Sequence, residues 1–148
     1  MAEPTTTAQR VFDVTMGLMD EVNESSGATD TTDTREYKQR ALFILNTLRG
    51  ELYPFSDTYK VDESGKRPIS PVIENFTDVI QLDDTICQSV MPYGLAAHLL
   101  LTETPDAAAF FQQRYEELVA KLAKGVPMGS EDIQDLYGGI EYGNFSRW

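Results

Sequence analysis

DDTICQSVMPYGLAAHLLLTETPDAAAFFQQRYEELVAKL, residues Asp83 to Leu122, is the stretch that decides the fold of this chain. Apolar or small residues recur in it at steps of three and four, which predicts two helices that each present one stripe to a partner helix. The stripes are Ile86, Val90, Tyr93, Ala97 and Leu100, followed by Ala108, Phe111, Tyr115, Leu118 and Leu122. Between them, Thr104-Pro105-Asp106 is typical of a helix N-terminus. The connection is so short that we expect an antiparallel hairpin.

The first of these two helices has an unusual composition. Pro92 interrupts its apolar periodicity and removes one backbone donor, which predicts a kink or a late helix start. Gly94, Ala96 and Ala97 carry little side-chain bulk, so another backbone can approach closely. Apolar residues also lie off the main stripe, namely Leu95, Leu99 and Leu101. We therefore expect a central helix, or a helix buried in an oligomer interface.

The order of these segments resembles that of a known family. A helix reading MPYGLAAHLLL, an acidic turn with proline and a helix reading AAAFFQQRYEELVAKL are similar to the helical head–tail connector (adaptor, or head-completion) proteins of tailed bacteriophages. The resemblance covers roughly Leu82 to Ala123. It implies an all-helical protomer in a ring of about twelve copies, docked on the portal protein and joined to the tail or to the next neck protein. It also implies a place in the neck of the virion, after synthesis in the bacterial host cytoplasm, with genomic DNA passing through the lumen unbound.

Two further helices are predicted before this hairpin. The first spans about Thr6 to Val22 and is followed by a polar connection over residues 23–34. Asp33 and Glu36 resemble a capping box that opens the second helix, which Pro54 ends. The buried stripe expected for this second helix is Tyr37, Ala41, Leu45, Leu48 and Leu52. The chain is therefore interpreted as all-α, a bundle of about four helices.

Residues 54–82 interrupt the helical pattern with three prolines and a turn-like Asp62-Glu63-Ser64-Gly65. Tyr59 and Val61 before the turn, with Ile69 and Val72 after it, suggest a small hairpin. Long loops in small domains tend to be functional. Two interpretations stay open, a contact with a neighbouring subunit or the next ring, and a mobile insertion.

Gly125 is expected to end the last helix, so residues 1–125 form the helical domain and residues 126–148 form a C-terminal tail. The tail is rich in large apolar side chains, which either fold back on the bundle or insert into a partner. We favour the partner, and the resemblance implies that this partner is the portal protein. The candidate portal-binding residues are Tyr137, Ile140, Tyr142, Phe145 and Trp148.

The formal net charge of the 148 residues is −12, which disfavours a nucleic-acid grip because such a grip needs Lys and Arg. One interpretation is an acidic surface that resists non-specific association, and another is a channel that DNA does not stick to. An alternative function is an acidic DNA mimic that inhibits a DNA-binding enzyme. No apolar run approaches the roughly 20 residues that span a bilayer, so no membrane partner is expected.

Catalytic signatures are missing from the sequence. Cys87 and His98 are the single cysteine and histidine, too few for the usual zinc site, and they lie about three helical turns apart on one predicted helix. Cys87 is interpreted as a buried hydrophobe and His98 as a polar residue on a packed face. Asp83-Asp84 is expected to cap a helix, and Glu117 to pair with Lys121. We expect no enzyme, cofactor or metal site, although a small enzyme using Cys87 and His98 is a weaker alternative.

Overall fold

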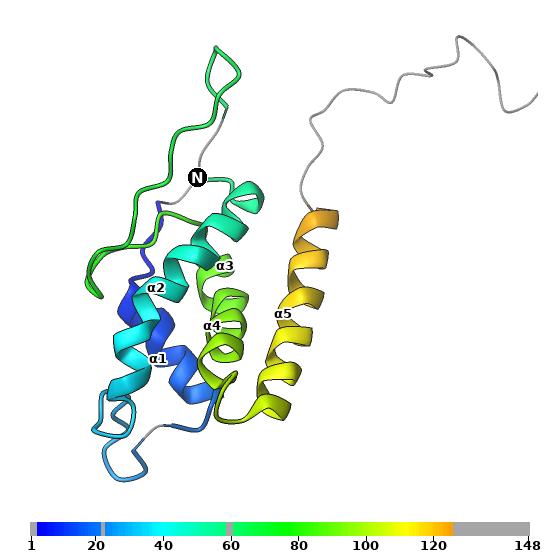
Figure 1. Cartoon of the computed structure of the whole chain (residues 1–148). Coiled ribbons are helices and arrows are strands. Elements are labelled where there is room, and N and C mark those ends of the chain that lie inside the picture. The colour runs from blue at the N-terminus through cyan, green and yellow to red at the C-terminus, as the bar shows by residue number, and fades with distance from the viewer. Residues whose placement is uncertain (1–2, 22, 59–60, 126–148) are drawn as a thin grey trace, which may run out of the picture.

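The computed structural model describes residues 3–21, 23–58 and 61–125, and they form an all-α bundle (Figure 1). No strand forms in these ranges, apart from an isolated antiparallel bridge between Thr7 and Val79. The elements are α1 (Ala8–Leu18), α2 (Arg35–Leu52), the 3-10 turn η1 (Tyr53–Phe55), α3 (Asp84–Ser89), α4 (Met91–Leu100) and α5 (Pro105–Gly125). In the described part of the chain, no helix is both long enough and apolar enough to cross a membrane.

Helix α1 is shorter than predicted at its C-terminal end. Its N-terminus is capped by Thr7, whose hydroxyl accepts a hydrogen bond from the Arg10 N–H at 3.1 Å. At the other end Asp20 has a φ of 59°, and the N–H of Glu21 donates to the Met16 carbonyl at 2.8 Å. This is a Schellman ending with aspartate in the position that glycine usually takes. The helix predicted to reach about Val22 therefore ends at Leu18.

The predicted stripe of α2 is confirmed, since Tyr37, Ala41, Leu45, Leu48 and Leu52 are all buried. The predicted capping box at its N-terminus is wrong. Thr34, not Asp33, directly precedes the helix, and it makes no side-chain cap. Its hydroxyl instead donates to the Thr29 carbonyl at 2.6 Å, so it ties down the loop before the helix.

The predicted interruption at Pro92 is confirmed as a break between two helices. Helix α3 ends at Ser89, Val90 has a φ of −111°, and α4 begins at Met91. Proline near the start of α4 fits there because the first helical N–H groups have no intrahelical acceptor.

Helix α4 is the centre of the bundle and packs against α1, α2, α3 and α5. Its buried residues are Met91, Pro92, Gly94, Leu95, Ala96, Ala97, Leu99 and Leu100. A Cβ atom on Gly94 would lie 2.8 Å from Cδ2 of Leu48 on α2 and 2.9 Å from Cε1 of Tyr115 on α5. Gly94 is therefore tightly packed, but side chains make the close approach and not the backbone that was expected. The α4–α5 pair forms the predicted antiparallel hairpin (Figure 1).

The loop between η1 and α3 runs beside α2 without forming strands in its described residues. Its turn forms as predicted, with the Asp62 N–H donating to the Lys66 carbonyl at 2.9 Å. The possible hairpin is not seen, because Val61, Ile69 and Val72 are exposed and unpaired as strands, and Tyr59 lies outside the described residues. Prolines at 68 and 71 remove backbone donors from this segment, which explains the missing ladder.

Candidate functional site

The predicted portal-binding residues belong to the tail, outside the part of the chain that the structure describes. They are Tyr137, Ile140, Tyr142, Phe145 and Trp148, and with them the proposed boundary between domain and tail stays a prediction. In the described residues the candidates are the side chains that the sequence singled out, one surface pocket and the exposed apolar side chains.

Cys87 and His98 are not brought together as a nucleophile and base. Cys87 is fully buried in α3, where its thiol donates to the Leu82 carbonyl at 3.8 Å. Burial, aided by the nearby charges of Asp84 and Asp83, raises the pKa of the Cys87 thiol to about 12. A thiol with this pKa stays protonated at neutral pH and is a poor nucleophile. His98 is exposed on α4, so the prediction that it lies on a packed face is wrong.

The side chains of Asp83 and Asp84 hydrogen-bond to segments that are distant in sequence, and neither side chain caps α3. The carboxylate of Asp84 accepts hydrogen bonds from the backbone N–H groups of Thr5 at 2.8 Å and Thr6 at 3.0 Å. The two threonine hydroxyls donate to it as well, at 2.7 and 2.8 Å. The Thr5 backbone N–H, then the Thr5 hydroxyl and the Thr6 donors, lower the pKa of Asp84 to about 2. We call this group, Thr5, Thr6 and Asp84, the N-terminal clasp.

Asp83 binds the loop between η1 and α3, which we call the central loop, in the same way. Its carboxylate accepts from the Asp57 N–H at 3.0 Å and from the Thr58 hydroxyl at 3.1 Å. The predicted helix cap is therefore replaced by contacts between distant segments. Both aspartates have structural partners, and neither is left as a general acid or a metal ligand.

The acidic pair on α5 is solvent-exposed, as its position on an amphipathic helix predicts. The partner of Glu117 is Arg114, at 3.4 Å, and not the predicted Lys121. Glu116 accepts a hydrogen bond from Gln112 at 3.1 Å. Exposed pairs of this kind contribute little to stability and make no reactive site.

Two tyrosine–glutamate hydrogen bonds join the hairpin to α2, and sequence patterns gave no signal of either. The Tyr37 hydroxyl donates to Glu103 at 2.5 Å, and the Tyr115 hydroxyl donates to Glu51 at 2.8 Å. Burial is the first cause that raises the pKa of both phenols, followed by the glutamate partner. Phenols with raised pKa values remain protonated donors, so these contacts hold the helices together.

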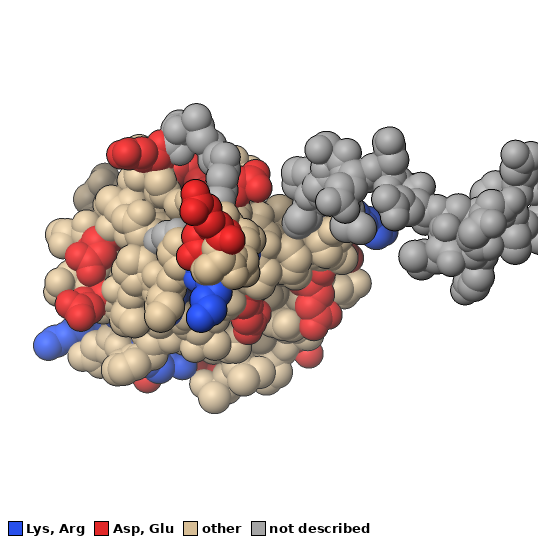
Figure 2. Space-filling view, turned by 90° about the horizontal axis from the view of Figure 1, so that it is seen from above, with Lys and Arg blue, Asp and Glu red and all other residues tan. Residues whose placement is uncertain are grey.

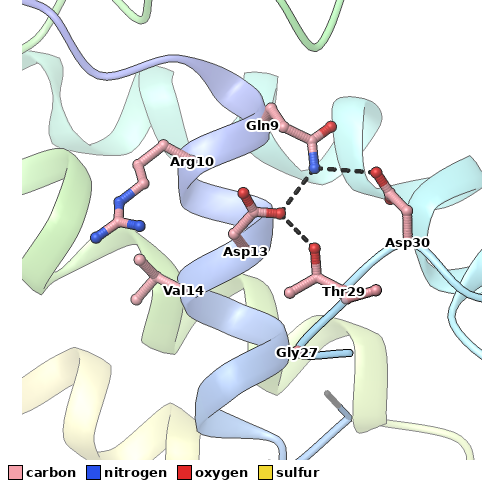
Figure 3. Close-up of a pocket in the computed structure, with 8 residues that line it drawn as sticks. Gln9, Arg10, Asp13, Val14, Gly27, Thr29 and Asp30 are labelled. Atoms are coloured by element: carbon pink, nitrogen blue, oxygen red, sulfur yellow. Dashed lines mark hydrogen bonds between the residues drawn. The ribbon is translucent and has the colours of Figure 1, made fainter. Parts of the chain in front are cut away.

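An open pocket of about 720 Å³ lies between α1 and the loop that follows it (Figure 3). One oxygen of Asp13 accepts from Gln9 at 2.8 Å and from Thr29 at 2.6 Å, and Gln9 also reaches Asp30 at 3.3 Å. These contacts hold the loop on α1. Among the described residues no three His, Cys, Asp or Glu side chains converge as metal ligands, here or elsewhere.

What remains as a candidate site is exposed apolar surface at two places. The first is the outer face, which we define as Phe43 on α2 with Ile69 and Val72 on the central loop, exposed by 79%, 94% and 61%. The second is the turn end, which we define as Leu101 and Phe110 around the α4–α5 turn, exposed by 61% and 63%. Large exposed aromatic and aliphatic side chains favour protein–protein contacts over small-molecule chemistry.

Acidic side chains are spread over the end of the molecule seen in Figure 2 and do not gather into one patch. Comparison with protein-family models, with curated proteins and with solved structures gave no match.

Proposed function

We propose that this protein is a structural head–tail connector, which forms a ring under the portal of a tailed bacteriophage and extends the DNA channel toward the tail. The observation that carries the proposal is the role of the α4–α5 hairpin. The stretch that resembles the connector family contains α4, the packing centre of the bundle, and large apolar side chains stay exposed on α2 and α5. A protomer with two separate apolar surfaces suits a ring.

The charge of the chain supports the same proposal. With a net charge of −12, a ring of these protomers would repel a passing duplex and would not bind it. The described residues include the ion pairs Lys38–Asp30 and Arg114–Glu117, and the net excess of negative charge over the chain remains to contribute to this repulsion. In this proposal the protein has no catalytic role and resides in the virion neck.

The tail supplies the contact with the portal in this proposal. Residues 126–148 place Tyr137, Ile140, Tyr142, Phe145 and Trp148 on one short segment, and aromatic side chains make strong interface anchors. Residues between Ala8 and Tyr115 already supply the bundle with a core of buried apolar side chains. We therefore expect a chain truncated after Gly125 to stay folded while losing portal docking.

The test is negative-stain imaging and co-sedimentation of the full chain with its cognate portal. A ring stacked on the portal is the expected result. The truncated chain and a variant with alanine at Tyr142, Phe145 and Trp148 should fail to bind, while Ser146→Ala, a tail substitution that keeps every aromatic residue, should bind normally. Full docking of the truncated chain would refute the role of the tail. A small acidic species that ignores the portal and competes with DNA for an enzyme would establish the DNA-mimic alternative.

A further inference from the structure

Three side chains along one side of α2 and η1 bind the backbone of the central loop. They are Asn46, Arg49 and Tyr53, which follow one another at steps of three and four and which we call the donor row. The Asn46 side chain accepts from the Ile73 N–H at 2.8 Å and donates to the Ile73 carbonyl at 2.9 Å. The donor row binds the loop over residues 67–73, which we call the strap.

The other two members of the donor row bind carbonyl groups of the strap. Arg49 donates to the Ser70 carbonyl at 3.1 Å, and the Tyr53 hydroxyl donates to the Pro68 carbonyl. The guanidinium of Arg67 lies over the Tyr53 ring, 4.3 Å from its centroid. The hydrogen bonds all reach backbone atoms of the strap. They therefore do not depend on which side chains the strap carries at these positions.

The strap has the period of a polyproline II helix. Ser70 and Ile73 are buried and Arg67 is half-buried, while the residues between them are exposed. Burial of every third residue is the polyproline II repeat, and Pro68 and Pro71 hold φ near its value. A polyproline II helix makes no internal hydrogen bonds, so its carbonyl groups are open to side-chain donors. The strap is therefore bound to the donor row as a polyproline II peptide is bound to its receptor.

The strap is an imperfect occupant of this site. The described residues offer no hydrogen-bond partner to the hydroxyl of Ser70, although only 6% of this residue is exposed. A buried hydroxyl without a partner keeps its desolvation cost. The strap also buries little apolar surface, since Ile73 is its one buried aliphatic residue while Ile69 and Val72 are exposed. A few hydrogen bonds and one apolar anchor therefore hold it in place.

The two ends of the central loop are fixed to the bundle independently of the strap. Before the strap, Asp83 binds residues 57–58. After the strap, N–H groups at the start of α1 donate to the carbonyls of Phe76 at 2.9 Å and Asp78 at 3.0 Å. The strap can therefore leave α2 as a local opening while the helices stay packed, and this opening exposes the donor row.

We propose that the donor row is a binding site for a proline-containing segment of another chain in the polyproline II conformation, with the strap as its internal occupant. The structure defines the ligand, because it shows such a segment in the site. The ligand supplies one carbonyl to Arg49 and one to Tyr53, and it places an apolar residue with a free N–H opposite Asn46. An apolar side chain at the Ser70 position would improve it. The site lies outside the tail, so the inference is independent of portal docking.

The first test measures peptide binding to the full chain by fluorescence anisotropy. The probe is a labelled, end-capped peptide of the sequence KRPISPVIEN, residues 66–75. Ile73→Ala in the chain weakens the strap and keeps the donor row, and circular dichroism verifies its fold. Ile73→Val takes its place if the alanine variant unfolds. Asn46→Ala in the same background damages the row, and a control peptide with N-methyl-isoleucine at the Ile73 position lacks only the N–H.

We expect the peptide to bind the Ile73→Ala chain at least about 10-fold more tightly than the wild-type chain, whose own strap competes at high effective concentration. Adding Asn46→Ala, or using the N-methyl peptide, should weaken this binding at least about 10-fold. A peptide with alanine at the Ser70 position should bind at least about five-fold more tightly, because it buries no unpartnered hydroxyl.

Hydrogen exchange tests strap release without weakening the strap. In the wild-type chain the Ile73 amide should exchange by a local opening that sub-denaturing urea hardly affects, whereas the Leu48 amide of α2 should follow global unfolding. Ser70→Ala in the chain should slow exchange of the Ile73 amide at least about five-fold. The Ile80 amide, which lies outside the strap, should exchange at an unchanged rate.

Three results would overturn the inference. The first is an Ile73 amide that exchanges only with global unfolding. The second is a peptide that fails to bind the strap-weakened chain up to about 1 mM. The third is peptide binding that Asn46→Ala leaves unchanged, since the donor row would then not be the site.

Discussion

Replacing Asp84 tests the N-terminal clasp. The Asp84 carboxylate accepts four hydrogen bonds there. Its four donors come from two residues, Thr5 and Thr6, which lie 79 and 78 positions away. Asp84→Asn keeps the shape of the side chain but turns one acceptor into a donor and removes the charge. The change should therefore weaken the attachment of the N-terminal segment without disturbing α3.

The expected loss follows from the pKa of this carboxyl group. Its fall from an ordinary 3.8 to about 2 sets a ceiling of roughly 2.5 kcal/mol on the charge-dependent part of the clasp. Because Asp84 is partly open to solvent, screening reduces the expected cost of Asp84→Asn to about 1 kcal/mol. Asp84→Ala should cost about 2 kcal/mol, since it leaves the N–H of buried Thr6 without its acceptor.

The pH dependence of the free energy of unfolding has a definite sign. A depressed carboxyl pKa stabilises the folded state above the unfolded value near 3.8, and this stabilisation is lost as the pH falls toward about 2. The wild-type chain should therefore lose more stability than Asp84→Asn between pH 5 and pH 2. Urea unfolding followed by circular dichroism measures both effects.

Asp106→Asn is the control for this experiment. Asp106 also lies in the first turn of a helix but is exposed and has no threonine partners, so it reports the interaction with the helix dipole alone. Equal destabilisation by Asp84→Asn and Asp106→Asn would contradict the role of the clasp. So would an Asp84→Asn variant whose free energy of unfolding falls between pH 5 and pH 2 as much as that of the wild-type chain.

Three other changes probe the bundle. Tyr115→Phe loses the hydrogen bond to Glu51 and should lower the free energy of unfolding by about 1 kcal/mol in urea titrations, and an unchanged midpoint would contradict this. Cys87 should react with a thiol reagent at pH 8 only as fast as the protein unfolds, because its thiol is buried and protonated; rapid labelling of the folded chain would refute this. Gly94→Val should destabilise by at least about 3 kcal/mol, since even a Cβ atom there meets α2 and α5 side chains within 3.0 Å. Gly50→Ala, where a Cβ would have open space, should instead stabilise by about 0.5–1 kcal/mol, and thermal unfolding of the pair checks the opposite signs.

Periodicity predicted most of the fold because it reports which side of a helix is buried. The stripe from Tyr37 to Leu52 followed directly from residue spacing. The apolar circumference of α4 indicated either a central helix or an oligomer interface, and the structure shows the central position. The predicted end of α1 was less accurate, because Asp20 takes a left-handed conformation that an aspartate rarely adopts. The N-terminal clasp was invisible to sequence patterns, because they contain no information on which distant segment meets Asp84.

The candidate surfaces were only partly visible in the sequence. Phe43 falls off the predicted stripe of α2, and in Phe110-Phe111 two adjacent residues cannot both face the core. These signals identify exposed aromatic residues but do not predict that the loop with Ile69 and Val72 lies along α2. That placement depends on Asn46 and Arg49, whose bonds to the central loop appear only in the folded molecule.

The position of α4 at the centre has a consequence for the order in which the chain folds during synthesis. Helix α1 packs mainly against α4 and only slightly against α2, and its first residues are held by Asp84. While the ribosome makes residues 1–90, the apolar sides of α1 and α2 therefore have no complete core to enter. The nascent chain exposes this surface until the hairpin emerges, after which α1, α2 and α5 can all pack on α4 in one cooperative step.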